Sequence, residues 1–148
     1  MYTNTQGNWA YVNVRTSAVL TTSYVAGTVI GLNNDVLGTV SPNDINCNHF
    51  NQLILECNLT KESLTSVEVK IEYSEDNSVW YQETNKAVLG GATTLTPGEY
   101  TIVCSGLDAA ANFLIEIPIK YRYIRVSSKG TGTVTSCVFG IKAKLGTV

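Results

Sequence analysis

The fold is decided by a nine-residue stretch, Ser66-Val67-Glu68-Val69-Lys70-Ile71-Glu72-Tyr73-Ser74, in which apolar and charged side chains alternate without a break. In an extended chain, alternate side chains point to opposite faces, so the apolar residues take one face and the charged residues take the other. A helix would scatter the four apolar residues around its circumference. The stretch therefore predicts an antiparallel strand with one buried face and one wet face, on which Glu68 and Glu72 are solvated charges.

The same alternation recurs along the chain, with turn residues between the segments. Three more strands are predicted at Leu53–Leu59, Phe113–Ile119 and Cys137–Leu145, and shorter ones at Tyr11–Val14, Ala18–Val25, Val79–Glu83, Glu99–Cys104 and Tyr121–Ser127. Turns are predicted at Glu75-Asp76-Asn77-Ser78 and at Lys129-Gly130-Thr131-Gly132. Pro118 cannot donate to a sheet ladder, so its strand is expected to lie at an edge or to end there. Eight or nine short strands predict an all-β antiparallel sandwich or barrel.

The chain has the length of one ordinary domain, at 148 residues. We expect a polar N-terminal arm over residues 1–10 and a single β-sandwich domain over residues 11–148. The segment Gly31–Asn51 lacks periodicity apart from a short strand candidate at Val36–Val40, and loops of that length are usually functional. Helix is expected only as one turn within Leu107–Asn112.

The charge content excludes several classes of partner. Charged residues make up only 15% of the chain, the net charge is −2, and Lys and Arg are scattered, which disfavours nucleic-acid binding. No apolar run approaches the roughly 20 residues that cross a bilayer, and the N-terminal residues lack the pattern of a secretion signal. We therefore expect no nucleic acid and no membrane as partners. A weakly charged polar surface suits a protein that packs against copies of itself or other proteins.

Four cysteines, Cys47, Cys57, Cys104 and Cys137, leave three alternatives open. Cys57 and Cys137 are in step with apolar neighbours, where a free thiol behaves as a small hydrophobe. Buried free thiols are the favoured interpretation, one disulfide is the second, and a metal site is the least favoured because no Cys-x-x-Cys pair is present.

Catalytic groups are scarce in the sequence. His49 is the only histidine and hence the only ordinary candidate for a general base near neutral pH. Cys47 lies two residues from it, but the stretch matches no known nucleophile signature. Nucleotide-binding glycine motifs are missing as well. We expect no catalytic, cofactor-binding or metal-ligating residues and interpret the chain as a protein that is not an enzyme.

Aromatic residues supply the candidate contact surface. Trp80 is expected in the core. Tyr121 and Tyr123 are expected to share one face of their strand, and three more rings lie near the N-terminus, where large exposed rings often mark an interface. The candidate partner-interface residues are Tyr2, Trp9, Tyr11, Tyr121 and Tyr123.

Two stretches carry a family resemblance. Val69–Trp80 contains Ser74-Glu75-Asp76-Asn77-Ser78-Val79-Trp80, which resembles the S-x-D-x-x-x-W hairpin of discoidin-like jelly rolls. Arg122-Tyr123-Ile124-Arg125-Val126 resembles the R-Y-I-R-V strand of the same fold. A broader run, from Asn51-Gln52-Leu53-Ile54-Leu55 to Lys144-Leu145-Gly146-Thr147-Val148, looks like small virion proteins of tailed bacteriophages and covers about two-thirds of the chain.

The resemblance implies a jelly roll that serves as a virion structural protein. Such proteins decorate or cement capsids, commonly as trimers, or sit in the neck or tail. It implies the major capsid protein or other virion proteins as partners, a homo-oligomer, assembly in the host cytoplasm and a final place on the capsid surface. Discoidin-like relatives bind glycans through loop aromatics, and no aromatic cluster is expected in such a loop here. The leading hypothesis is therefore a capsid decoration protein; the alternatives are a carbohydrate-binding adhesion module and a neck or tail component.

Overall fold

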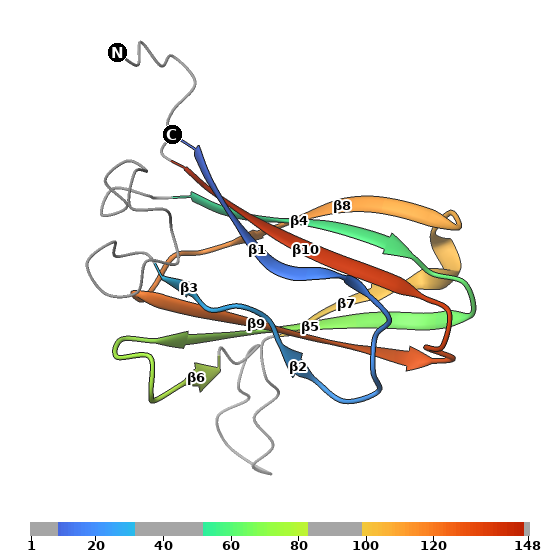
Figure 1. Ribbon diagram of the computed structural model, residues 1–148, viewed down its shortest axis with the longest axis horizontal. Helices are drawn as coiled ribbons and strands as arrows, with labels where there is room; N and C mark the ends of the chain where they lie inside the picture. The colour runs from blue at the N-terminus through green and yellow to red at the C-terminus, as the bar shows by residue number, and fades with distance from the viewer. Residues whose placement is uncertain (1–8, 32–51, 83–98, 147–148) are drawn as a thin grey trace, which may run out of the picture.

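The chain folds into two packed β-sheets (Figure 1). The computed structural model describes residues 9–31, 52–82 and 99–146. These residues contain a single 3-10 helix, Cys104–Gly106, and ten strands: β1 (Trp9–Ala18), β2 (Val25–Ala26), β3 (Ile30–Gly31), β4 (Gln52–Thr60), β5 (Leu64–Ser74), β6 (Tyr81–Gln82), β7 (Glu99–Val103), β8 (Ala110–Ile117), β9 (Tyr123–Gly132) and β10 (Val138–Gly146). The predicted all-β fold is confirmed. No helix in these ranges is long and apolar enough to cross a membrane.

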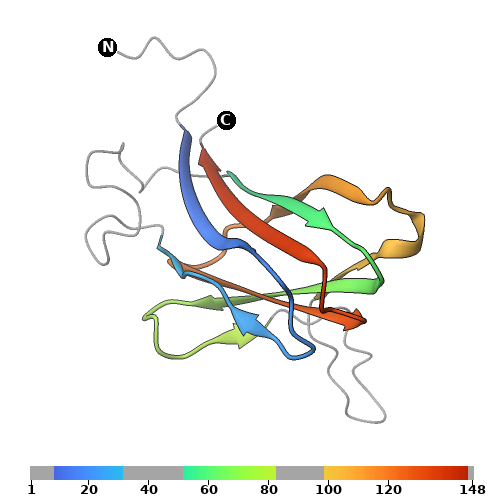
Figure 2. The ribbon, with the colours of Figure 1, turned by 45° about the vertical axis from the view of Figure 1, so that its right-hand side comes forward.

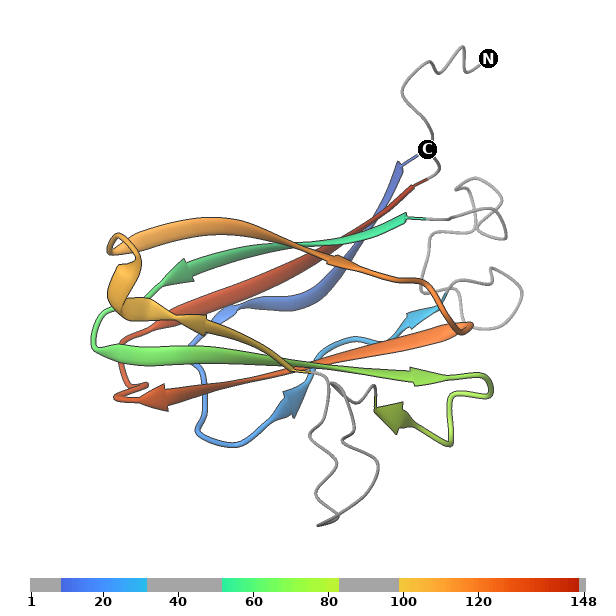
Figure 3. The same ribbon diagram turned by 180° about the vertical axis from the view of Figure 1, so that it is seen from behind.

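The strand order is that of a jelly roll. One sheet has the order β1-β10-β4-β8, and the other has β2-β9-β5-β6, with β3 also on β9 and β7 also on β5. β2 and β3 can be counted as one interrupted strand, and so can β6 and β7, which leaves eight strands in chain order. The first then pairs with the last, the second with the seventh, the third with the sixth and the fourth with the fifth. This pairing from the ends inward is how a jelly roll places its strands in two antiparallel sheets. Seen from behind, the two sheets lie one above the other and spread apart toward the end that carries the chain termini (Figure 3).

The core lies between the two layers and is built from the alternating residues that the sequence indicates. On β5 the buried set is Val67, Val69, Ile71 and Tyr73. On β4 it is Leu53, Leu55, Cys57 and Leu59, and toward the C-terminus it is Cys137, Phe139, Ile141, Ala143 and Leu145. Burial of such side chains, at about 25 cal/mol per Å² of apolar area, is the main force that holds the two sheets together.

Gly27 and Thr28 join the two sheets at one side of the sandwich. The Gly27 amide donates to the Val126 carbonyl of β9, and the Thr28 amide donates to the Val14 carbonyl of β1, both over 2.8 Å. A Cβ at position 27 would lie 2.5 Å from the Val14 carbonyl oxygen. Glycine is therefore required for the approach of this segment to β1. Figure 2 shows the connection running from β1 at the first layer to β2 and β3 at the second.

Three local predictions are wrong for identifiable reasons. Of the strand expected at Ala18–Val25, only the two ends lie in strands, Ala18 in β1 and Val25 in β2, and residues 19–24 form a loop. The Arg15 guanidinium donates to the Ala18 and Val19 carbonyls at the end of β1 and takes up those acceptors. The turn expected at residues 129–132 continues β9, because Gly130 pairs with Val67 and its missing side chain makes room for Leu64. The helical turn lies at Cys104–Gly106, ahead of the range in which it was expected.

Other boundaries follow the sequence more closely. β8 ends at Ile117, directly before Pro118, and it is an edge strand, as predicted. β1 begins at Trp9, so the last two residues assigned to the arm pair with Gly146 and Leu145 in the first sheet. The candidate strand at Val36–Val40 and most of the Gly31–Asn51 segment lie outside the described residues.

Candidate functional site: an aromatic rim

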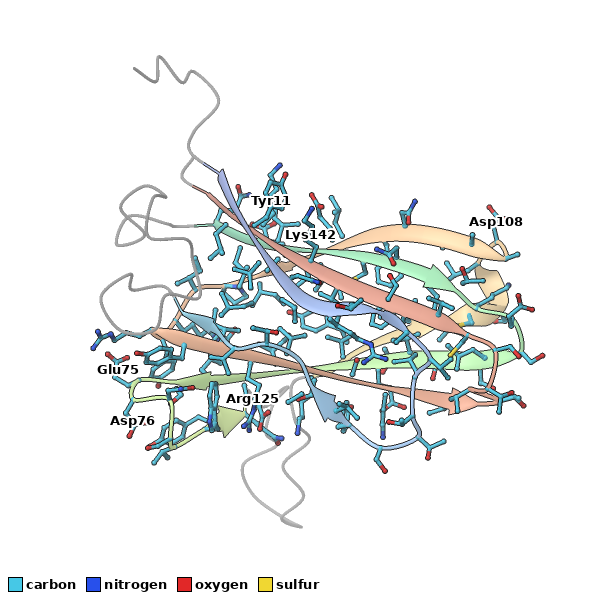
Figure 4. The ribbon with its side chains drawn as sticks, in the orientation of Figure 1. Tyr11, Glu75, Asp76, Asp108, Arg125 and Lys142 are labelled. Carbon is cyan, nitrogen blue, oxygen red and sulfur yellow. The ribbon has the colours of Figure 1, made fainter. Side chains whose placement is uncertain are left out.

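Among the predicted interface residues that the structure describes, Tyr11 and Tyr121 lie on different sheets. Tyr2 lies outside the described residues, and Trp9 is placed by its backbone pairing in β1. Tyr11 is exposed on the outer face of the first sheet, where the Lys142 ammonium lies 4.7 Å from its ring centre (Figure 4). Tyr121 lies two residues before the start of β9, which belongs to the second sheet. The aromatic residues of the two sheets therefore present separate surfaces.

Tyr123 is wrongly predicted as a contact residue. It is only 2% exposed and so offers no area to a partner, whereas Tyr121 is 39% exposed. Strand alternation indicates which face a residue takes, but it does not tell whether that face is covered. Of the pair, only Tyr121 remains available for binding.

Tyr121 belongs to an aromatic group that the sequence did not indicate, formed with Tyr73 and Tyr81. We call this group the tyrosine rim. The Tyr81 and Tyr121 rings stack with centroids 6.3 Å apart and planes inclined by 17°. The Tyr73 ring lies 5.9 Å from that of Tyr121 and is tilted by 40°. Tyr81 is 57% exposed, so Tyr81 and Tyr121 together present aromatic area to solvent.

The base of the rim is held by the core. Tyr73 is a buried member of the core cluster, and its hydroxyl donates to the Pro118 carbonyl over 3.0 Å. The Lys120 ammonium lies 5.8 Å from the centre of the same ring. The segment between β8 and β9, which carries Tyr121, is thus tied to β5. The exposed rings are positioned before any partner arrives.

Asp76 shapes the turn that brings Tyr81 to Tyr73. Its carboxylate accepts from the Ser78 and Val79 amides, both at 2.9 Å, and from the Ser78 hydroxyl at 2.8 Å and the Ser74 hydroxyl at 3.1 Å. These donors, led by the Val79 amide, hold the pKa of Asp76 well below its usual range. The chain reverses with Asn77 at φ 61°, and Tyr81 then pairs with Tyr73 across the β5–β6 hairpin. Asp is common in tight turns because its side chain accepts hydrogen bonds from the backbone a few residues further on.

Trp80 lies on the opposite side of the same hairpin and is not in the core, contrary to expectation. Its ring stacks against the Arg125 guanidinium, whose central carbon is 4.3 Å from the ring centre. Arg125 Nε also donates to Glu72 Oε2 over 2.9 Å. Stacked and paired in this way, Arg125 connects Trp80 to β5.

Glu72 is buried, and its prediction as a solvated charge is wrong. β5 is an inner strand of its sheet, so side chains of neighbouring strands lie across its outer face. Burial by itself would raise the pKa of Glu72, but the Arg125 hydrogen bond, the charges of Lys70 and Arg125 and a hydrogen bond from Gln82 together lower it. Glu72 is a carboxylate that its partners keep ionised.

The remaining charges on this face are also paired. Lys129 lies 3.0 Å from Glu68, and the Tyr24 hydroxyl donates to Glu68 over 3.2 Å. The ammonium groups of Lys129 and Lys70 lie 4.7 and 5.0 Å from the centre of the Tyr24 ring. Because these charges are paired with one another, the face offers little to a charged ligand.

The described residues hold no group of three or more His, Cys, Asp or Glu side chains that could bind a metal ion. Cys57, Cys104 and Cys137 are free and buried. Burial raises the pKa of Cys57 to about 12 and raises that of Cys104 as well, so both remain thiols near neutral pH. His49, the candidate base, and the neighbouring Cys47 lie outside the described residues.

Trp80 and Tyr81 are the functional candidates that sequence reasoning missed. Adjacent residues on a strand take opposite faces. Trp80 therefore lies against the outer face, and Tyr81 lies at the rim. The alternation of β5 and the turn at Asp76 together could have placed Tyr81 opposite Tyr73. The contact with Tyr121 depends on a segment 40 residues further along the chain and carries no local signal.

Comparison with known proteins adds little to this geometry. No protein-family model and no curated protein matches the chain. One solved structure, described as "Bacillus endospore appendages form a novel family of disulfide-linked pili", is similar over 100% of this chain and 96% of that chain, with 11% sequence identity and a TM-score of 0.38. A likeness at this level carries no argument about function.

Proposed function

We propose that the chain is a non-enzymatic structural protein of a bacteriophage particle, a capsid decoration protein that docks on the shell formed by the major capsid protein. The observation that carries the binding role is the tyrosine rim, which exposes Tyr81 and Tyr121 on a rigid base. The resemblance of the broader run, from Asn51 to Val148, to small virion proteins of tailed bacteriophages supports the choice of partner.

The rim has the properties of an interface anchor. Tyrosine is enriched among the residues that dominate binding energy, because it offers large apolar area and a polar tip at little entropic cost. The Tyr73 hydroxyl bond to Pro118 and the Asp76 turn hold the rim in place. Rings that are already fixed lose less freedom on binding, so more of the contact energy appears as affinity.

A decoration protein acts through number rather than through strength of each contact. Each bound copy stabilises the shell by mass action, and the contributions of many copies accumulate. The small net charge of −2 allows copies to approach one another closely. Under this proposal the protein is made in the host cytoplasm, resides on the capsid surface and binds there with other virion proteins.

Co-sedimentation with capsids tests the proposal. Capsids assembled from the major capsid protein of the same genome, without this chain, would be mixed with wild-type protein at micromolar concentration. We expect saturable binding, and we expect Tyr81→Ser/Tyr121→Ser to weaken it at least about tenfold, the loss typical of interface anchors. Tyr11→Ser, which removes an exposed ring from the other sheet, is the matched control and should bind as wild type does. Absence of wild-type binding would contradict the proposal, and loss with Tyr11→Ser alone would move the contact to the first sheet.

Carbohydrate binding is the second candidate, and the rim is also the observation that favours it. Exposed rings offer flat apolar area that can pack against the apolar faces of sugars. Trp80, which follows the same turn and precedes Tyr81 in the chain, serves as the fluorescent reporter. A glycan array, followed by titration with the best sugar while tryptophan fluorescence is recorded, separates the two candidates. A sugar-dependent change that Tyr81→Ser/Tyr121→Ser removes would favour an adhesion module over a decoration protein. A neck or tail component would bind protein through the same rim and differ only in its place in the particle.

A further inference from the structure

The sheet edges of the described part of the chain differ in how well they are protected. An exposed edge presents unpaired amide and carbonyl groups, and proteins blunt such edges with short strands, bulges or charges. β2, β3 and β6 each have two residues, and β7 has five. β1 has ten residues, but its register shifts twice, and Arg15 reaches over its end to the Phe139 carbonyl. These edges are all protected in one of the usual ways.

β8 carries none of these protections. Its eight residues pair with β4 one for one, from Ala110 opposite Thr60 to Ile117 opposite Leu53, without a register shift. The strand lies at the edge of the first sheet (Figure 3). It contains one charged residue, Glu116, and its proline follows only after the strand has ended. Along β8, the described structure offers a regular, nearly uncharged edge to another strand.

The side chains of β8 are also incompletely covered. Leu114 is 68% exposed, more than any other large hydrophobic residue among those described. Phe113 points toward the core and stacks on Phe139 with centroids 6.3 Å apart, yet it is only partly buried. A hollow beside the strand is lined by Glu56, Cys57, Asn58, Asn112, Phe113 and Leu114. Apolar area therefore remains open on both faces of this edge.

We infer that β8 binds β8 of a second copy of this chain, antiparallel and about a two-fold axis at Leu114. The two first sheets then form one continuous sheet, in the order β1-β10-β4-β8 followed by the same strands reversed. A two-fold axis makes each residue of one copy meet a residue of the other at equal distance from the axis. The inference goes beyond the proposed function and does not depend on it.

The register follows from which side chains share a face. Leu114, Asn112 and Glu116 lie on the outer face, and Ile115 and Ile117 lie on the core face. Opposite residues of an antiparallel pair share a face, so the axis must pass through a residue position; a shift by one would mix the two faces.

With the axis at Leu114, the chemistry on both faces matches. Leu114 meets Leu114 of the second copy, and Glu116 meets Asn112, which can donate a hydrogen bond to a carboxylate. On the core face Phe113 meets Ile115 and Ala111 meets Ile117, which are apolar pairs of the kind that stabilise sheets. An axis at Phe113 would instead leave Glu116 opposite Ala110. An axis at Glu116 would oppose two like charges. Of these registers, only the one at Leu114 gives both the apolar pairs and a partner for the Glu116 charge. The edge is thus complementary to itself, and we take its partner to be a second copy of the chain.

Sedimentation of the full chain over a range of concentrations tests the inference. We expect the apparent mass to rise from 16.0 kDa to twice that value as concentration increases. Leu114→Lys places two ammonium groups opposite each other at the axis, and we expect it to raise the dissociation constant at least about tenfold. Because Leu114 is exposed, this change leaves the single-copy fold intact, which the circular dichroism spectrum and the melting temperature verify. Val103→Lys, at another exposed edge position in β7, is the matched control and should dimerise as wild type does.

A cysteine pair tests the register itself. Opposite residues of an antiparallel pair have Cα atoms about 4.5–5.5 Å apart, within the span of a disulfide. In oxidised glutathione, which takes up the two electrons and two protons, Leu114→Cys should form a covalent dimer faster than Val103→Cys, which contains the same four native cysteines. A wild-type chain that stays monomeric to millimolar concentration would overturn the inference. So would a dimer or trimer insensitive to Leu114→Lys, or equal cross-linking of the two cysteine variants.

Discussion

Asp76 illustrates how a single exposed side chain determines the position of residues several places further along. Its carboxylate accepts four hydrogen bonds from the turn that it begins, and this turn sets Trp80 against Arg125 and Tyr81 against Tyr121. The effect depends on charge, because a carboxylate accepts these bonds more strongly than a neutral acid does. The sequence predicts the turn from its composition, but the identity of the four donors appears only in the folded chain.

Asp76→Ala should lower the melting temperature at neutral pH, since the turn loses its acceptor. The pKa of Asp76 is depressed by folding, so its contribution is complete above the ordinary value of 3.8 and is lost as the pH falls below that value. The difference in melting temperature between wild type and Asp76→Ala should therefore shrink steadily below pH 4. Glu75→Ala, which removes an exposed carboxylate of the same turn, is the control with little effect. A difference that stays constant down to pH 2 would contradict this assignment.

Among the residues on the outer face of the second sheet, Arg125 is the one whose removal should lower the free energy of unfolding most. Arg125→Ala leaves the buried Glu72 without its closest donor, and the free energy of unfolding should fall by about 1.5–3 kcal/mol, as for other hydrogen bonds to charged groups. Chemical denaturation at pH 7 measures the change. Arg122→Ala removes the same charge from a position outside this contact and serves as the control. If the two bonded groups act together, Glu72→Gln/Arg125→Ala should lose less than the sum of the single variants; full additivity would argue against the pair.

At the scale of elements, the strands most completely predicted are those whose partners lie on both sides. β4, β5 and β10 are inner strands with one face on the core, and alternation of apolar residues is enough to define them. The short strands β2 and β3 carry too few residues for a pattern. Their positions depend on the backbone bonds of Gly27 and Thr28 to strands far away in sequence. The edge role of β8 was predicted because Pro118 gives a local signal.

The candidate site was less predictable than the fold, and Tyr123 and Tyr81 show why. Alternation placed Tyr123 on the same face as Arg125, yet its burial depends on what lies over that face. Tyr81 acquires its role only when β6 folds back on β5 and the segment before β9 brings Tyr121 alongside. The face that a side chain takes on its strand can be predicted from the local sequence. Whether other segments cover that face, and which rings meet there, depends on the tertiary fold.

Replacing Gly27 should separate the segment that joins the two sheets from β1. Gly27→Ala places a Cβ 2.5 Å from the Val14 carbonyl oxygen, so β1 and the Gly27–Thr28 segment must separate. We expect a loss of about 1–3 kcal/mol in the free energy of unfolding, as for other overpacked sites. Thr28→Ala keeps the amide that donates to Val14 and should cost much less. Equal losses in the two variants, measured by urea denaturation, would show that close approach is not the cause.

At the scale of the whole molecule, the protein is a sandwich held by apolar burial, with three thiols inside it. Cys57, Cys104 and Cys137 belong to the core cluster and face neither solvent nor a metal within the described residues. The raised pKa values of Cys57 and Cys104 follow from the same burial. The core therefore contributes to stability without chemical reactivity.

Titration with a thiol reagent checks this arrangement. Of the four cysteines in the chain, no more than one should react quickly in the folded protein at pH 7, and all four should react in denaturant. The melting temperature should be the same with and without a reducing agent, because none of the three core cysteines is in a disulfide. Rapid reaction of two or more thiols in the folded protein would contradict the burial of the three core cysteines. Fewer than four reactive thiols after denaturation without reductant would show that a disulfide is present.

We propose that this jelly roll docks its tyrosine rim on a protein shell. Under this proposal, electron cryomicroscopy of phage particles that contain this chain tests the docking. We expect density for the two-layered sandwich on the outer surface of the capsid, with Tyr81 and Tyr121 buried against the major capsid protein. Particles that carry no copy on the shell, or copies whose rim faces solvent, would contradict it.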